Sequence, residues 1–226
     1  RVGIRVHGMF VLGSDADTVE TIEQTLRFAK TMNLDTAQFF ALTPVPGPPL
    51  TARYAREGKI IAPGQWHLYD AQHAVIWPAK MTPYELQMGT IRASLDFYSY
   101  REAWRHWREG RGLFNAVIRI KGRRLARQII RDSAPYLAAL RQLEAWWKRL
   151  ERERAAWSER VKRLAQDQGM RLEEKRARMR DLLDDICAQI RASAESLAAE
   201  FRPYIQQLTD RLSEALQREF EELVGI

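Results

Sequence analysis

The sequence has 226 residues, of which 46% are hydrophobic, so it is long enough to form one full domain and a smaller one around a buried core. Its single cysteine, Cys187, excludes an internal disulfide and cannot by itself hold a zinc ion or an iron–sulfur cluster. No signal peptide and no uninterrupted apolar run of membrane-spanning length is visible, so we expect a cytoplasmic protein without a transmembrane segment.

The net charge of +7 is unevenly distributed. Residues 111–160 hold 13 Lys and Arg against 5 Asp and Glu, whereas residues 161–226 hold 11 against 13. A basic stretch of this kind meets nucleic acid, an anionic membrane surface or an acidic substrate, or it is a solvated helix face. Because the mildly acidic segment follows directly, we favour pairing between these two segments over a nucleic-acid partner.

The first 50 residues predict the order strand, helix, strand. Residues 2–12 and 36–42 are rich in β-branched and apolar side chains, as in buried strands. Between them, Asp17 and Glu20 have the spacing of a capping box, and apolar residues then recur at helical spacing up to Asn33. Such a βαβ unit pairs its strands in parallel. Because a single unit leaves both edges of its sheet open, we expect further strands upstream.

A loop and a long helix are expected next. Residues 44–64 are dense in proline and glycine, which predicts a loop, and residues 74–77 predict a short strand. The Thr-Pro-Tyr-Glu segment 82–85 is a strong helix start, with a threonine cap, proline at the first position and glutamate at the third. We expect this helix to run to about Trp107 and to end at the glycines of segment 110–112.

Beyond residue 112 the sequence predicts helix throughout. Apolar residues recur at steps of three and four, as in a heptad seam, in two successive runs. The runs are Tyr136, Leu140, Leu143, Trp147, Leu150, Trp157, Val161 and Leu164, and then Met179, Leu182, Ile186, Ile190, Leu197, Phe201, Ile205, Leu208, Leu212, Phe220 and Leu223. A glycine between the runs predicts an antiparallel hairpin about Gln168 and Gly169, and Pro203 should kink or restart the second helix.

Tryptophans and arginines alternate between residues 101 and 160. The tryptophans are Trp104, Trp107, Trp146, Trp147 and Trp157. This pattern is compatible with base stacking beside phosphate contacts, with binding to an anionic membrane, or with helix packing in which arginine side chains cover apolar flanks. The helical spacing of the seam favours helix packing.

Two histidines lie six residues apart, at His67 and His73, beside Tyr69 and Asp70. Histidine is a common metal ligand, but two histidines without further nearby ligands are weak support for a metal site. We therefore predict no metal site here and favour a structural or substrate-pocket role.

Two segments are candidates for binding a ligand as well as for forming part of the fold. Segment 8–15 runs from a strand into a glycine-containing turn, where open backbone N–H groups can hold a polar ligand and Gly13 allows it to approach closely. Segment 39–47 ends the next strand with two prolines and a glycine, a stiff loop at the sheet edge where α/β barrels place their ligands. Each segment is also compatible with an ordinary connection that binds nothing.

In this order, the two segments resemble radical S-adenosylmethionine (radical SAM) enzymes. A late barrel strand of the form Gly-x-Phe-x-x-Gly matches Gly8–Gly13. A Thr-Pro-x-Pro-Gly-Thr loop is similar to Thr43–Pro48, with Pro48 in place of the last threonine. Downstream, the segments Trp66–His73, Met81–Leu86 and Phe97–Ser99 are similar to those of the cobalamin-associated branch. That branch includes the anaerobic Mg-protoporphyrin ester cyclases and the B12-dependent radical methyltransferases. The resemblance covers about residues 1–110.

The resemblance implies an S-adenosylmethionine site that is contacted mainly through backbone and apolar side chains. Carried over to this sequence, its residues are Phe10, Leu12, Gly13, Thr43 and Pro44. It also implies a [4Fe–4S] cluster that cleaves S-adenosylmethionine reductively to a 5′-deoxyadenosyl radical, a small-molecule substrate, and cobalamin as a further cofactor. The Cys-x-x-x-Cys-x-x-Cys motif that holds the cluster is absent from this sequence. We therefore expect the C-terminal portion of such an enzyme, inactive by itself.

The expected fold class is α/β followed by all-α. Residues 1–80 would form the C-terminal part of a partial (βα) barrel, residues 81–111 a connecting helix, and residues 112–226 an α-helical extension in the form of a long helical hairpin tail. The alternative to an enzyme fragment is a helical docking module, in which the tail binds a protein partner or a second copy of the chain. A basic helix that binds nucleic acid or a membrane surface is a weaker alternative.

Overall fold

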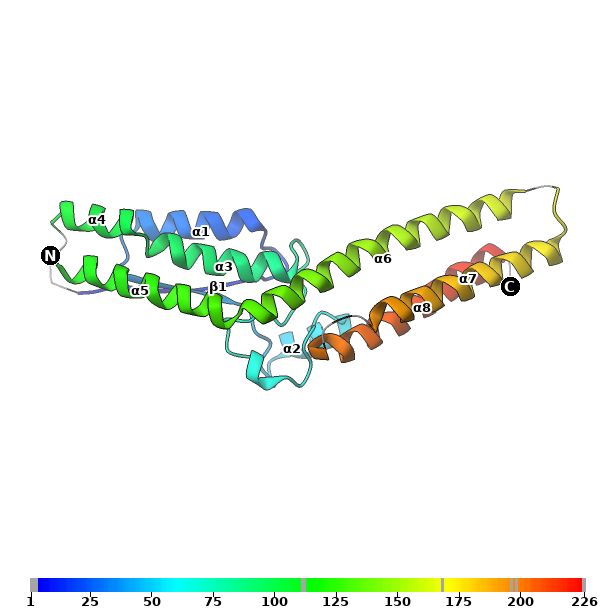
Figure 1. Cartoon of the computed structure of the whole chain (residues 1–226), viewed down its shortest axis with the longest axis horizontal. Coiled ribbons are helices and arrows are strands. Elements are labelled where there is room, and N and C mark those ends of the chain that lie inside the picture. Colours follow the sequence, from blue (N-terminus) through cyan, green and yellow to red (C-terminus); the bar gives the residue numbers. More distant parts are fainter. Residues whose placement is uncertain (1–3, 111–112, 168, 196, 198, 225–226) are drawn as a thin grey trace. The chain divides into compact units, whose positions relative to one another are not determined.

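A computed structural model describes residues 4–110, 113–167, 169–195, 197 and 199–224. The chain divides into two units, Arg1–Leu140 and Arg141–Ile226 (Figure 1). The first unit contains β1 (His7–Leu12), α1 (Val19–Thr31), β2 (Thr36–Ala41), α2 (Pro49–Glu57), a short 3₁₀ turn η1 (Trp66–Leu68), α3 (Pro83–Phe97), α4 (Tyr100–Arg108), α5 (Leu113–Asp132) and the start of α6 (Ala134–Gln166). The second unit contains the rest of α6, α7 (Leu172–Ala194), a 3₁₀ turn η2 (Ala199–Phe201) and α8 (Arg202–Val224).

The predicted βαβ unit is confirmed. β1 and β2 pair in parallel from His7 opposite Thr36 to Leu12 opposite Ala41, and α1 connects them. One face of this sheet is covered by helices, because the Phe10 ring meets α1 and the Phe39 ring meets α3. Residues 1–3, the predicted start of the first strand, lie outside the described residues.

The two edges of the sheet differ. On the outer edge of β2, the Tyr98 hydroxyl accepts a hydrogen bond from the Ala37 N–H at 3.0 Å and donates one to the Ala37 carbonyl at 2.7 Å. Further along the same edge, the Ala41 N–H donates to the Ala71 carbonyl at 2.8 Å. Among the described residues, β1 pairs with no strand other than β2. The sheet is therefore closed beside β2 and open beside β1.

The cap of α1 is one residue later than predicted. Thr18 is the N-cap, and it forms a capping box with Thr21. The Asp17 carboxylate instead accepts hydrogen bonds from the N–H groups of Gly13 and Ser14, both at 2.9 Å. Aspartate is a good cap, but the turn before the helix offers this carboxylate two donors, and a threonine is available at the next position.

Two predictions for segment 44–77 are wrong in detail. The proline-rich loop contains a helix, α2, whose first residue is Pro49; its cap position, Pro48, makes no side-chain hydrogen bond. Proline is well tolerated in the first turn of a helix. The prolines of this segment, which predicted a loop, therefore also include the start of a helix. In place of a strand at 74–77, the structure has a single antiparallel bridge between Ile60 and Ile76.

The helix predicted from residue 82 begins as expected but breaks early. Thr82 and Glu85 form the predicted capping box, and α3 then ends at Phe97. Ser99 caps a new helix, α4, by accepting a hydrogen bond from the Glu102 N–H. The break changes which residues share a helical face, and Trp104 of α4 is exposed. Gly112, part of the predicted helix end, lies outside the described residues.

The first unit extends to residue 140, whereas the sequence placed the start of the helical extension at residue 112. Arg119 of α5 has a fully buried side chain, in what the charge pattern suggested was a solvated basic face. Its guanidinium donates to the carbonyl of Phe97 at 2.6 Å and to that of Leu34 at 3.0 Å. These carbonyls lie at the end of α3 and just after α1, where intrahelical donors run out, so α5 is tied to both.

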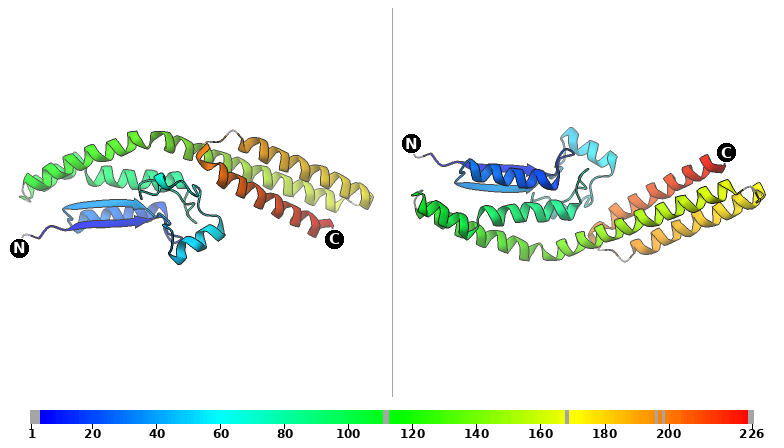
Figure 2. Two further views of the ribbon diagram at one scale, coloured as in Figure 1. Left: turned by 90° about the horizontal axis from the view of Figure 1, so that it is seen from below. Right: turned by 90° about the horizontal axis from the view of Figure 1, so that it is seen from above.

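The second unit has three helical segments side by side, as both views of Figure 2 show. The predicted reversal of the chain falls between α6 and α7, with Gln168 outside the described residues, and Pro203 restarts a helix at α8. The unit is therefore not the two-helix hairpin that the sequence predicted. Hydrogen bonds from Trp146 to Ser193 at 3.0 Å and from Ser158 to Glu219 at 2.8 Å connect α6 to the other two helices.

The apolar side chains of the α6 heptad seam are buried within the chain itself. Leu143, Leu150, Trp157 and Val161 are all buried. A seam whose side chains are already buried offers no coiled-coil surface to a partner. The docking alternative therefore cannot use this seam.

Candidate functional site

The carboxyl ends of β1 and β2 lie at the same edge of the sheet. The N–H of Leu42 donates to the carbonyl of Leu12 at 2.7 Å, which joins the end of β1 to the start of the loop after β2. This edge brings together the turn at Gly13 and the loop at Thr43 and Pro44. In parallel α/β folds, ligands bind beyond the carboxyl ends of the strands, so this edge is the candidate site.

Phe10 and Leu12 point away from solvent, toward the helices. The Phe10 ring stacks on Phe39 with centroids 5.4 Å apart and meets Phe28 edge-on at 6.3 Å, and Leu12 is buried. Their side chains therefore belong to the core between the sheet and α1. A ligand at the edge can meet only their backbone atoms.

Gly13 packs closely against α3. Its φ of +103° is in the region that favours glycine, and a Cβ placed on it would lie 2.6 Å from Cδ2 of Leu86 in α3. Its N–H is already bonded to Asp17, as is that of Ser14. The expectation of open backbone N–H groups at this turn is therefore wrong for these two residues.

The loop after β2 is held by hydrogen bonds at both ends. The Thr43 hydroxyl donates to the Ala41 carbonyl at 3.1 Å, and Pro44 is buried. The Val45 N–H donates to the Thr43 carbonyl at 3.0 Å, and the Val45 carbonyl accepts from the Thr51 hydroxyl at 2.5 Å. The loop is therefore fixed to the end of β2 and to the start of α2.

An ion-pair cluster beside the edge was not predicted. Asp15, in the turn after β1, lies 2.7 Å from Nζ of Lys59 and 2.9 Å from a guanidinium nitrogen of Arg53. The hydrogen bond from Lys59 holds the pKa of the Asp15 carboxyl below its usual value, and the same bond raises the pKa of Lys59. Because the partners are 38 and 44 residues away in sequence, no local spacing could reveal the cluster. It fastens the β1 turn to α2.

The face of the sheet opposite the helices carries exposed apolar side chains. Met9 and Val11 are 65% and 60% exposed. Beside them, the His7 ring is within 2.7 Å of the Thr36 hydroxyl and 3.2 Å of the Gln38 side-chain oxygen. This face is apolar toward the carboxyl edge and polar at the opposite end.

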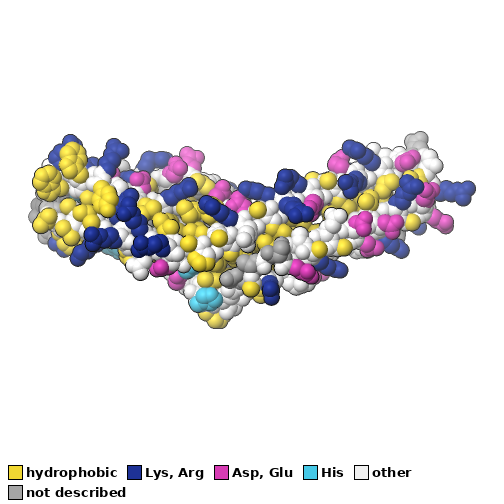
Figure 3. Space-filling model, in the orientation of Figure 1, with side chains coloured by type: hydrophobic (Ala, Val, Ile, Leu, Met, Phe, Trp, Pro, Cys, Tyr) yellow, Lys and Arg dark blue, Asp and Glu magenta, His cyan; other side chains and the backbone are white. Residues whose placement is uncertain are grey.

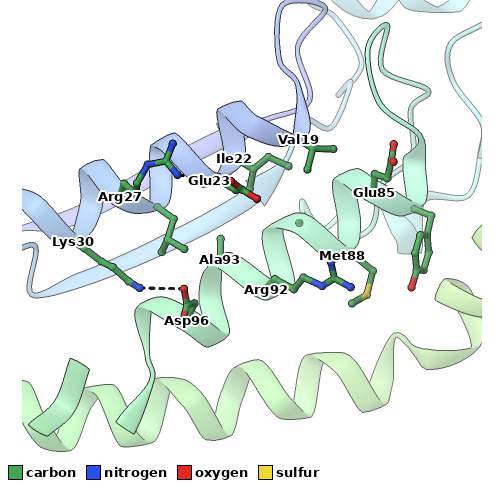
Figure 4. Close-up of a pocket in the computed structure, with 13 residues that line it drawn as sticks. Val19, Ile22, Glu23, Arg27, Lys30, Glu85, Met88, Arg92, Ala93 and Asp96 are labelled. Carbon is green, nitrogen blue, oxygen red and sulfur yellow. Dashed lines mark hydrogen bonds and ion pairs between the residues drawn. The ribbon is translucent and has the colours of Figure 1, made fainter. Parts of the chain in front are cut away.

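Two clefts lie away from the edge. One, of about 520 Å³, runs between α1 and α3; Figure 4 shows Ile22 and Ala93 inside it and the Lys30–Asp96 ion pair, 3.1 Å long, at one end. The other, of about 550 Å³, lies between β2 and α5. Neither is lined by a residue that the resemblance assigned to the site, so we do not place the site in either cleft.

The histidines near the site make ordinary contacts. His73 lies 3.0 Å from the Asp70 carboxylate and packs edge-on against Tyr136, which fits the structural role favoured from the sequence, while His67 is exposed. No group of three His, Cys, Asp or Glu side chains in the described part of the chain gathers in a way that could hold a metal ion.

Two curated proteins match part of the chain, whereas no family model and no solved structure matches it. Bacteriochlorophyllide d C-8(2)-methyltransferase of Chlorobaculum tepidum is 28% identical over 102 residues, or 45% of this chain and 22% of its own length. An uncharacterized methyltransferase of Pyrococcus horikoshii is 30% identical over 98 residues, or 43% of this chain and 21% of its own. The chain is similar to methyltransferases. It matches only about a fifth of the length of each of these relatives.

Among the helices of the described residues, none combines the length and the apolar character needed to cross a membrane.

Proposed function

We propose that this chain is the C-terminal part of a radical SAM methyltransferase of the cobalamin-associated branch. In this proposal β1 and β2 are late strands of a partial (βα) barrel, and their carboxyl edge forms part of the S-adenosylmethionine site. The observation that carries the proposal is the meeting of the Gly13 turn and the Thr43–Pro44 loop at that edge, in a chain similar to methyltransferases.

The asymmetry of the sheet supports the proposal. Tyr98 closes the edge beside β2, so additional strands would pair with β1, which is where upstream strands of a barrel would lie. The face that carries Met9 and Val11 would then turn toward the barrel interior, because α1 and α3 occupy the other face. Its exposed apolar side chains would be covered by the rest of the barrel and by bound ligand.

The described residues fit an apolar part of an S-adenosylmethionine site. Val11 on the open face and the backbone after Leu12 can contact the adenine and ribose, and the Thr43 hydroxyl can accept a hydrogen bond while it donates to Ala41. The Gly13 and Ser14 N–H groups are taken by Asp17, so the charged methionine end would be held elsewhere. The methyl group that the proposed reaction transfers comes from S-adenosylmethionine.

The [4Fe–4S] cluster does not fit the residues of this chain. Its ligands would be cysteines, and the sequence has only Cys187, in α7. The cluster and cobalamin therefore belong, in this proposal, to other parts of a longer protein, as does the binding of a small-molecule substrate. We derive no step through them here.

The test uses the longer protein with its cofactors restored. Val11→Ala, on the open face, is expected to raise the KM for S-adenosylmethionine several-fold, whereas the matched change Val19→Ala, at the start of α1, should leave it unchanged. Methyl transfer to a tetrapyrrole acceptor and production of 5′-deoxyadenosine are measured together. A protein that neither binds S-adenosylmethionine nor transfers its methyl group would overturn the proposal, as would equal effects of the two valine changes.

A further inference from the structure

A cluster of exposed hydrophobic side chains lies on α4 and the beginning of α5. Its members are Tyr100, Trp104, Trp107, Leu113, Phe114 and Val117, which we call the α4–α5 patch. Trp104, Trp107 and Leu113 are 55%, 62% and 72% exposed. The sequence favoured helix packing for all five tryptophans of this region. That is confirmed for Trp146 and Trp157, which are buried, and wrong for Trp104 and Trp107.

The patch is a continuous surface. Tyr100, Trp104 and Trp107 are spaced by four and three residues, so they lie along one face of α4. α4 packs against α5, whose first turns carry the other members. Figure 3 shows hydrophobic side chains gathered over this end of the first unit with Lys and Arg side chains around them. Contiguous exposed patches of this kind mark interaction sites.

The charged groups around the patch are almost all positive. Arg101 and Arg108 are exposed on α4, as are Lys121 and Arg124 on α5. The acidic side chains of α4 do not offset them, because Glu102 is buried and bonded to Arg105 and Glu109 lies 3.8 Å from the same arginine. The patch is therefore complementary to an anionic surface.

Guanidinium groups lie over three of the four rings of the patch. Arg108 lies over the Trp104 ring at 4.7 Å from its centroid, Arg5 over Phe114 at 3.6 Å, and Arg123 over Tyr100 at 5.1 Å. A nucleic-acid base stacks on an open aromatic face, and a guanidinium occupies one face of each of these three rings, which disfavours nucleic acid. Leu113 and Val117 have no face on which a base could stack, but they can enter the apolar boundary of a bilayer.

We propose that the α4–α5 patch docks the chain on the surface of an anionic membrane. Tryptophan and tyrosine prefer the headgroup level of a bilayer, and arginine side chains reach lipid phosphates while their stems cover apolar surface. The binding is peripheral, by a surface of two helices. It is independent of the methyltransferase proposal, because it uses no residue of the candidate site.

The test is co-sedimentation of the 226-residue chain with vesicles of phosphatidylcholine, with and without phosphatidylglycerol. Two paired variants remove the patch, Trp104→Ala with Trp107→Ala and Arg101→Gln with Arg108→Gln. Two matched controls make similar changes at exposed positions outside it, Met32→Ala with Leu172→Ala and Arg171→Gln with Arg180→Gln. Circular dichroism verifies that each variant is folded; the arginine pair keeps the test valid if the tryptophan pair does not fold.

We expect the chain to sediment with the vesicles that contain phosphatidylglycerol, and to bind them more weakly as the salt concentration rises. With vesicles of pure phosphatidylcholine, the chain should remain in the supernatant. The tryptophan pair should weaken vesicle binding about tenfold for each tryptophan removed, and the arginine pair about fivefold for each arginine removed. The control pairs should not change vesicle binding. The proposal is overturned if the chain ignores anionic vesicles or if the controls weaken binding equally. It is also overturned if the patch variants abolish self-association or binding to an RNA oligonucleotide but leave vesicle binding intact.

Discussion

Gly13→Ala isolates the packing role of the turn after β1. The change places a methyl group 2.6 Å from one Leu86 methyl and 3.1 Å from the other, and it puts an alanine at a φ of +103°. The backbone conformation costs about 1 to 2 kcal/mol, and the overlap with a buried leucine costs about 1 to 3 kcal/mol more. We therefore expect the free energy of unfolding to fall by about 2 to 5 kcal/mol.

Gly47→Ala is the matched control, because Gly47 has a similar φ of +109° and nothing within 4 Å of an added Cβ. It should lose only the conformational part, about 1 to 2 kcal/mol. Urea unfolding followed by circular dichroism measures both variants. Adding Leu86→Ala to the Gly13→Ala chain should cost less than Leu86→Ala costs in the original chain, since the clash is relieved. Equal losses for the two glycine variants would refute the reasoning.

Three further changes test contacts that hold the first unit together. Arg119→Met should lower the free energy of unfolding by about 2 to 4 kcal/mol, because two buried carbonyls lose their donors, whereas Arg124→Met on the exposed face should change it by less than about 0.5 kcal/mol. Asp15→Asn should cost up to about 1 kcal/mol at neutral pH. Lys59 lowers the pKa of Asp15, so the stability lost in the variant should vanish as the pH falls from about 4 through the lower pKa of the folded state. Denaturation at several pH values measures this. If the ion pair contributes nothing, the difference in unfolding free energy between the two chains will not change with pH. Tyr98→Phe should cost about 1 to 3 kcal/mol and speed amide exchange in β2 above all, and unchanged exchange there would contradict its role.

Local signals in the sequence predicted several of the elements whose hydrogen bonds are local, but not α2 or the α4 cap at Ser99. The capping box of Thr82 and Glu85 spans three residues, and it begins α3 where the sequence placed it. The parallel pairing of β1 and β2 follows from the length of the connection between them. By contrast, the Asp15–Lys59 pair and the Arg119 hydrogen bonds join residues 22 to 85 positions apart, which no spacing rule reaches.

For the candidate site, the sequence predicted the strand and the loop that carry it but not the orientation of their side chains. The sequence brought the Gly13 turn and the Thr43 loop to one edge, as the structure has them. It did not distinguish the faces of β1, because Phe10 and Val11 are both apolar, and a strand with apolar residues on both faces gives no alternation to read. Only the position of the helices decides that Phe10 is in the core and Val11 is exposed.

The contact between Tyr98 and β2 also has a consequence for the order of events during synthesis of the chain. It closes the edge of β2 from a position 61 residues after Ala37, so on the ribosome β2 is made well before the side chain that covers it. During that interval the edge of β2 is open and can pair with a neighbouring nascent chain. Once Tyr98 has been made and covers the edge of β2, this exposure ends. From then on, a further strand can be added only beside β1. A chain stopped before residue 98 should therefore aggregate more readily than one that includes it.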